Sequence, residues 1–237
     1  MGTSIFWLVV LVGFYFLIKK TDFIRFFLPP IAKAAFKSRT TEQKRVIRYF
    51  YLTGFLSHGE MSDVEYDALI KNYLDKTNFK KKAFDKFGLD EDEVTEVSPI
   101  KLENYFFNGD KTLWKVGKDG KERSSAYQVS WLFASSDKFY LYSHTFYLDA
   151  DTKKEISEEL FWKDIGKFST ASETVEVLKV KKVSSNGQPV YEKRNIETNL
   201  FTMSVPGDKI ECVTDGSDTT ERSLKGLRTK LDEKKKV

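Results

Sequence analysis

The chain has 237 residues, of which 41% are hydrophobic and 15% aromatic, and its formal net charge is +4. This composition is typical of a globular protein, and it excludes a wholly disordered chain and a collagen-like repeat. One cysteine, Cys212, allows no internal disulfide, and two histidines, His58 and His144, leave little for a metal centre or a histidine-based catalytic group.

The run from Ile5 to Ile18 contains only apolar residues and glycine. As a helix it spans about 21 Å, and the residues before it bring this near the roughly 30 Å hydrocarbon core of a bilayer. No Lys or Arg precedes it, unlike the start of a cleaved signal peptide. We predict a transmembrane anchor over residues 1–20, with a signal peptide and an interfacial or buried helix as alternatives. The anchor residues are Ile5, Phe6, Trp7, Leu8, Phe14, Tyr15, Phe16, Leu17 and Ile18.

Basic residues follow this apolar run. Residues 19–48 hold nine Lys and Arg against two acidic residues, a net charge of +7, so that residues 49–237 carry −3. The positive-inside tendency then predicts a single-pass protein of the cell membrane whose C-terminal part is cytoplasmic. The residues expected to fix this topology and to attract anionic lipids are Lys19, Lys20, Arg25, Lys33, Lys37 and Arg39.

Residues 21–39 are a basic juxtamembrane segment. Its stretch from Phe23 to Phe36 combines aromatic bulk with basic side chains, and Pro29-Pro30 interrupts any helix there. Two interpretations stay open: the stretch lies in the membrane interface, or it is a hydrophobic linker packed on the next domain. Nucleic-acid binding is not expected, because the rest of the chain is slightly acidic.

Residues 40–98 predict a small helical region. Thr40 and Thr41 are N-cap candidates for its first helix, and Ser62-x-x-Glu65 is a capping box for the second. A third helix ends at Gly88, a position typical of a left-handed C-cap. The stretch GEMSDVEYDALIKNYL within this region resembles a SHOCT-type helical pair, a short bacterial module.

Residues 99–237 alternate short β-rich runs with turns such as Asn108-Gly109 and Pro206-Gly207. The expected strands are Lys101–Phe107, Leu113–Val116, Ser124–Ala134, Lys138–Leu148, Glu159–Ile165, Thr174–Lys182, Asn195–Val205 and Lys209–Thr214. A terminal helix follows, with Leu224, Leu227 and Leu231 on one face.

This order of elements resembles a bacterial pleckstrin-homology-like domain. The resemblance implies an antiparallel β-barrel or sandwich of about seven strands closed by a C-terminal helix, so the whole chain is expected to be α+β. The turn from Ser135 to Lys138 stands where lipid-binding members carry several basic residues, and it has a single Lys. The resemblance therefore implies a protein-binding module. A lipocalin-like or other closed barrel is the structural alternative.

The sequence lacks the common catalytic, nucleotide-binding and metal-binding motifs. It has no Walker or Rossmann glycine pattern, no H-E-x-x-H, no G-x-S-x-G and no C-x-x-C. His144 lies in an alternating strand pattern, and Asp149, Asp151 and Glu155 lack the spacing of an EF-hand. We predict no enzymatic activity and no catalytic, cofactor-binding or metal-binding residues, and hence no cofactor.

Together these patterns predict a membrane-tethered, non-enzymatic protein whose cytoplasmic PH-like domain is a protein-interaction or scaffolding module at the membrane surface. The expected partners are the lipid bilayer and another membrane-associated protein. Two alternatives remain: a membrane-anchored β-barrel that binds a ligand, and a subunit of an envelope assembly.

Overall fold

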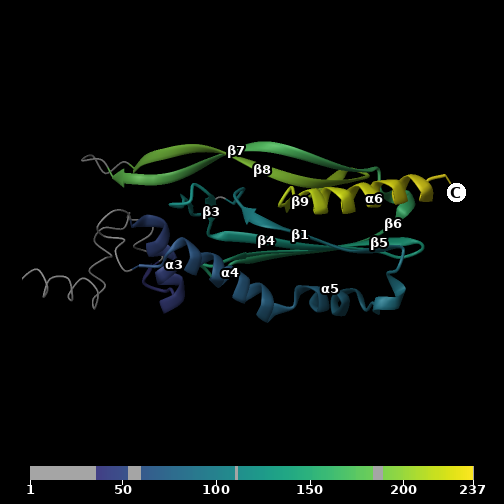
Figure 1. Ribbon diagram of the computed structural model, residues 1–237, viewed down its shortest axis with the longest axis horizontal. Helices are drawn as coiled ribbons and strands as arrows, with labels where there is room; N and C mark the ends of the chain where they lie inside the picture. The colour runs from purple at the N-terminus through teal and green to yellow at the C-terminus, as the bar shows by residue number, and fades with distance from the viewer. Residues whose placement is uncertain (1–35, 53–59, 110–111, 184–188, 237) are drawn as a thin grey trace, which may run out of the picture.

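The computed structural model describes residues 36–52, 60–109, 112–183 and 189–236. Its elements form three layers (Figure 1). Helices α3, α4 and α5 cover one face of a four-stranded sheet, and a three-stranded sheet together with helix α6 covers the other face. The central sheet is therefore buried on both sides, which explains why its inner strands β4 and β5 are almost continuously buried.

The helices of the first layer are bounded by capping residues. The helices are α3 (Thr41–Tyr51), α4 (Asp63–Thr77), α5 (Phe79–Phe87) and the short 3-10 helix η3 (Glu91–Glu93). Thr40 and Ser62 each close a capping box, the second with Glu65, and Gly88 ends α5 with a φ of 64°. These caps confirm the helix boundaries that the sequence predicted.

All described strands pair antiparallel. The four-stranded sheet has the order β1-β4-β5-β6, the three-stranded sheet the order β7-β8-β9, and β2 and β3 form a separate hairpin. The strands are β1 (Val97–Phe106), β2 (Trp114–Val116), β3 (Glu122–Ser124), β4 (Ala126–Ala134), β5 (Lys138–Tyr147), β6 (Lys153–Phe161), β7 (Lys167–Val183), β8 (Pro189–Val205) and β9 (Asp208–Thr214), with the 3-10 helix η4 (Trp162–Asp164) after β6 and helix α6 (Asp218–Lys234) at the end.

The described residues contain nine strands, whereas the sequence predicted eight strand segments and the resemblance implied about seven. The strand expected over Ser124–Ala134 is divided at Ser125, whose N–H donates to the carbonyl of Leu113 while its carbonyl accepts from Leu148. The backbone of Ser125 thus bonds to Leu113 on one side and to Leu148 on the other, between β3 and β4. The described strands form separate open sheets, and no closed barrel is seen among them.

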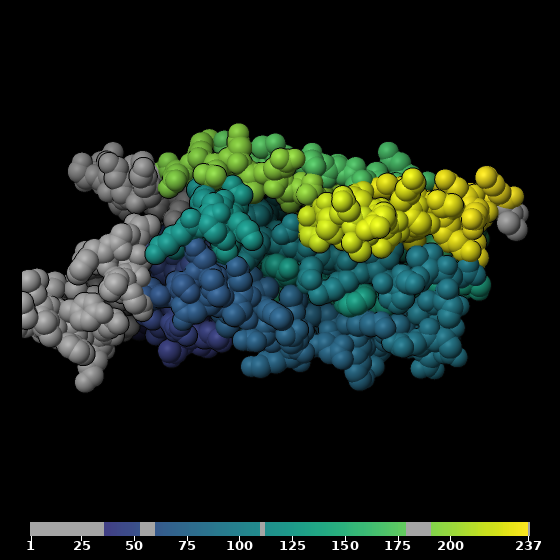
Figure 2. All heavy atoms as spheres, viewed as in Figure 1, coloured from purple at the N-terminus to yellow at the C-terminus, as the bar shows by residue number. Residues whose placement is uncertain are grey.

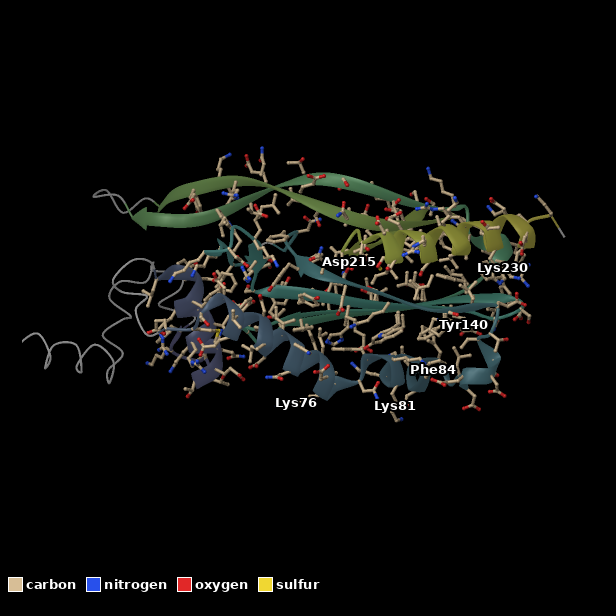
Figure 3. All side chains as sticks on the ribbon, in the orientation of Figure 1. Lys76, Lys81, Phe84, Tyr140, Asp215 and Lys230 are labelled. Atoms are coloured by element: carbon tan, nitrogen blue, oxygen red, sulfur yellow. The ribbon has the colours of Figure 1, made fainter. Side chains whose placement is uncertain are left out.

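The main hydrophobic core lies between the two larger sheets and α6. Leu224, Leu227 and Leu231 point from α6 into it, as their spacing predicts. A second core lies between α5 and the other face of the central sheet; Figure 3 shows Phe84 pointing from α5 toward this sheet while Lys81 points away.

The predicted membrane topology is wrong on this structure. No helix among the described residues is long and apolar enough to cross a membrane. The longest of them, α6, has 17 residues and buries three leucines on one face, so it is amphipathic. A fold class with a transmembrane helix and a single-pass location in the cell membrane are therefore not supported. The fold described here is a three-layer α+β arrangement.

Several of the predicted membrane residues lie outside the described residues. These are the expected anchor from Ile5 to Ile18 and the basic residues Lys19, Lys20, Arg25 and Lys33. Of the remaining two, Lys37 is exposed, whereas Arg39 is half-buried close to the carboxyl group of Asp149. The environment of Arg39 is thus that of a residue packed within the fold.

Candidate functional site

An open groove of about 790 Å³ lies between α4, β1, the β2–β3 hairpin and β8. In Figure 2 the blue α4 lies below and the yellow-green β8 above the teal residues of this region. Pockets of this size commonly hold ligands in proteins. We therefore take this groove as the candidate site.

One side of the groove is the free edge of β1. Ser125, directly before β4, accepts a 2.9 Å hydrogen bond from Leu148 in the register of the β4–β5 pair. The backbone N–H and C=O groups of odd-numbered residues in β4 therefore form hydrogen bonds with β5, and those of even-numbered residues form hydrogen bonds with β1. By the β1–β4 register, the backbone groups of Lys101, Glu103 and Tyr105 then face away from β4. β1 is the outermost strand of its sheet among the described residues, so these groups face the groove.

Asn104 closes this edge at one end. Its Oδ1 accepts a 2.8 Å hydrogen bond from the backbone N–H of Tyr105, which agrees with the orientation derived from the register. Its Nδ2 donates to the carbonyl of Thr214 at the end of β9, over 2.9 Å. The Asn104 side chain thus connects the edge of one sheet to the end of the other.

Part of the lining of the groove is apolar and aromatic. Ile70 and Leu74 contribute from α4, and Tyr105 and Tyr127 from the sheet. The two tyrosine rings meet edge to face with centroids 5.4 Å apart, a favourable aromatic geometry. Burial raises the pKa of both phenols, so they are neutral at physiological pH. This surface favours apolar groups of a ligand.

A charged network fixes the wall between α4 and the hairpin. Arg123 of β3 is only 2% exposed, and its guanidinium donates to both oxygens of Asp67 on α4 at 2.8 Å. It also donates to both oxygens of Asp119 in the hairpin turn. The Tyr105 hydroxyl donates to Asp67 over 2.7 Å. The hydrogen bonds from Arg123 are the main reason that the pKa of Asp67 is lowered.

The charges along the groove nearly cancel. The acidic lining residues are Asp67, Asp75, Glu103, Glu122 and Glu197, and the basic ones are Lys71, Lys101, Lys121 and Arg123. Arg123 is neutralised by Asp67 and Asp119, and Lys101 pairs with Glu103 over 2.7 Å. No excess of positive charge is left for a phosphate or a nucleic acid.

His144 lies outside the groove, under α5. It is 2% exposed, and its Nδ1 is 3.5 Å from both the Glu155 carboxylate and the Tyr142 hydroxyl. Glu155 in turn accepts a 2.7 Å hydrogen bond from Lys82 of α5. Burial, and next the charge of Lys82, lower the pKa of His144, so the imidazole is neutral near pH 7. This network connects α5 to strands β5 and β6.

The acidic residues singled out in the sequence are not brought together. Asp149 is buried beside Ser125, Asp151 accepts from the Gln43 side chain at 2.7 Å, and Glu155 belongs to the network under α5. Within the described part of the chain, no group of three His, Cys, Asp or Glu could hold a metal ion. Cys212 is buried in the main core, and burial raises the pKa of its thiol to about 11.

Sequence reasoning did not find the groove. Asp67 and Arg123 are 56 residues apart in the chain and meet only through the packing of α4 on the sheet. The available signal was the stretch from Lys101 to Tyr105, an alternating strand with polar and aromatic side chains on one face. In comparisons with known proteins, no family model, no curated protein and no solved structure matches this chain.

Proposed function

We propose that this protein is a non-enzymatic interaction module whose groove beside β1 binds a segment of a partner protein. The observation that carries the proposal is the groove itself, whose lining combines apolar and aromatic residues with charged side chains of nearly balanced sign. Recognition of protein segments typically combines apolar anchors with a polar rim in this way.

The roles of the charged side chains favour binding over catalysis. Arg123 and Asp67 are engaged with each other, and Asp67 also holds the Tyr105 hydroxyl. Such mutual pairing fixes the shape of the groove walls. His144 lies outside the groove and holds α5 on the sheet, with Glu155 and Tyr142 as its partners. These groups have structural roles, which supports a non-enzymatic function.

A displayed library of random 12-residue peptides tests the proposal on the full chain. Peptides selected by the wild-type protein are measured against Leu74→Arg, which places a long charged side chain into the lining of the groove. We expect binding to weaken at least tenfold, because the arginine occupies the apolar surface. Peptides that bind both proteins equally would contradict the proposal.

Val64→Arg is the matched control. Val64 lies on the same helix but is 78% exposed and does not line the groove, so its arginine leaves the groove open. Circular dichroism and thermal unfolding establish that both variants remain folded. As an independent measurement, hydrogen exchange on the wild-type complex is expected to show protection in α4 and β1.

A further inference from the structure

We infer that the partner segment binds as an additional β-strand on the free edge of β1, along a short stretch of about five residues. This inference rests on the proposed function, and it adds the mode of recognition and the chemical class of the partner. The class is an extended, uncharged segment with an apolar side chain directed toward α4. Three structural observations lead to it.

The first observation concerns the backbone groups on the outer edge of β1, which pair with no other strand among the described residues. The N–H and C=O groups of Lys101 and Glu103 face away from β4, and so does the C=O of Tyr105. They belong to an edge strand that has no further partner strand among the described residues. Such a row of donors and acceptors is a template for an added strand.

The second observation is that both ends of this edge are closed. At one end, the N–H of Tyr105 is taken by the Asn104 side chain. At the other end, Pro99 has no N–H, and the register of β1 shifts between Val97 and Ile100. An added strand therefore pairs only with the stretch from Lys101 to Tyr105, which is roughly 17 Å long at 3.4 Å per residue.

The third observation is the difference between the two sides of the edge. Side chains of a strand alternate between faces, so an added strand presents every second residue to α4. On that side lie Ile70, Leu74 and the ring of Tyr127, which favour an apolar group. On the other side the groove is lined by Ile196, Glu197 and Thr198 of β8; of these, only Glu197 is exposed, and its carboxylate favours a polar group. The balanced charge of the lining fits a segment without net charge.

The backbone of the free protein provides a test that needs no partner. In amide hydrogen exchange followed by NMR, we expect the N–H groups of Lys101 and Glu103 to exchange fast. Those of Leu102 and Asn104, which bond to β4, are expected to exchange slowly. Equal protection of both sets in the free protein would overturn the inference, because it would show that the edge is already paired.

Proline at position 103 tests the mode of binding. Glu103→Pro removes an N–H that the β1–β4 ladder does not use, so the sheet is expected to form while selected peptides bind at least tenfold more weakly. Glu103→Gln is the matched control, since it also removes the carboxylate charge but keeps the N–H, and it is expected to bind more tightly than Glu103→Pro by the contribution of that N–H.

Backbone-methylated peptides give the same information without altering the protein. N-methylation at every second residue of a selected peptide is expected to abolish binding in one of the two frames only. If Leu74→Arg weakens binding but neither Glu103→Pro nor methylation in either frame does, the groove binds its partner in another way and strand addition is refuted. If Leu74→Arg has no effect, the proposed function fails, and the inference fails with it.

Discussion

The Gln128 side chain on β4 holds the backbone of Val213 on β9. Its Oε1 accepts a 2.7 Å hydrogen bond from the Val213 N–H, and its Nε2 donates to the Thr145 hydroxyl over 3.0 Å. Gln128 is buried, so both halves of its amide are satisfied inside the protein. This one side chain therefore connects the central sheet to the three-stranded sheet, next to the place where Asn104 reaches Thr214.

Gln128→Met is expected to destabilise the protein by about 1–3 kcal/mol, because methionine fills the volume but leaves the buried N–H of Val213 without an acceptor. Urea unfolding measures the change. Thr145→Val is the control, since it removes the other partner of Gln128 and keeps the bond to Val213. Its cost is expected to be smaller. Equal costs would show that the bond to Val213 has no special role.

Arg123 is expected to be the most sensitive charged residue of the groove. Arg123→Met leaves Asp67 and Asp119 facing each other without their common cation. Loss of a fully buried partner costs about 3–5 kcal/mol, but both carboxylates are partly exposed, so we expect about 2 kcal/mol. The variants Asp67→Asn and Asp119→Asn complete double-mutant cycles in urea. Additive effects in these cycles would contradict the network.

Much of the secondary structure was predictable because its signals are local. The capping box at Ser62 and Glu65, the glycine at position 88 and the leucine spacing of the last helix each depend on residues close in sequence. The break at Ser125 was not predictable, because it comes from bonds to Leu113 and Leu148. Such bonds between distant residues leave no periodic pattern in the sequence.

The groove was beyond prediction for a similar reason. The strand containing Lys101, Glu103 and Tyr105 was expected, but its position at the edge of the sheet depends on strand order. The strand order β1-β4-β5-β6 skips the β2–β3 hairpin, which instead forms a wall of the groove. Hydrophobic alternation specifies which face of a strand is buried and leaves its neighbours undetermined.

The His144 network predicts a loss of stability in mild acid. The pKa of His144 is lowered in the folded protein, so the unfolded chain takes up a proton near pH 6.5 while the folded chain does not. The contribution of neutral His144 to the free energy of unfolding is therefore complete above pH 6.5. It declines as the pH falls toward the pKa of His144 in the folded protein. Urea unfolding at pH 7 and pH 5.5 measures this decline.

His144→Gln is expected to show a smaller decline between these two pH values, since glutamine does not titrate. The charged groups around His144 are Lys82 and Lys86 of α5 and Lys153 and Glu155 of β6, and the variant keeps all four. If the stability of His144→Gln declines as steeply as that of the wild type, the acid sensitivity comes from another part of the fold.

Asp149 is expected to lower the stability of the protein at neutral pH. It is buried, and its Oδ1 has no hydrogen-bond partner among the described residues. Burial raises the pKa of this carboxyl, although a hydrogen bond with Ser125 and the nearby charge of Arg39 act to lower it. A raised pKa means that the folded protein favours the neutral form, so the ionised carboxylate opposes folding above that pKa. Asp149→Asn is expected to stabilise the protein at pH 7.

This gain depends on pH in a defined direction. As the pH falls, the wild-type carboxyl is protonated in the folded state first, and the difference between wild type and Asp149→Asn shrinks below the folded pKa. Unfolding in urea at pH 7 and pH 4 measures both differences. Asp151→Asn is the control, because it makes the same carboxyl-to-amide change on an exposed side chain, and it is not expected to stabilise the protein at pH 7. Destabilisation by Asp149→Asn at pH 7 would show instead that the hydrogen bond with Ser125 and the attraction to Arg39 outweigh the cost of burying the charge.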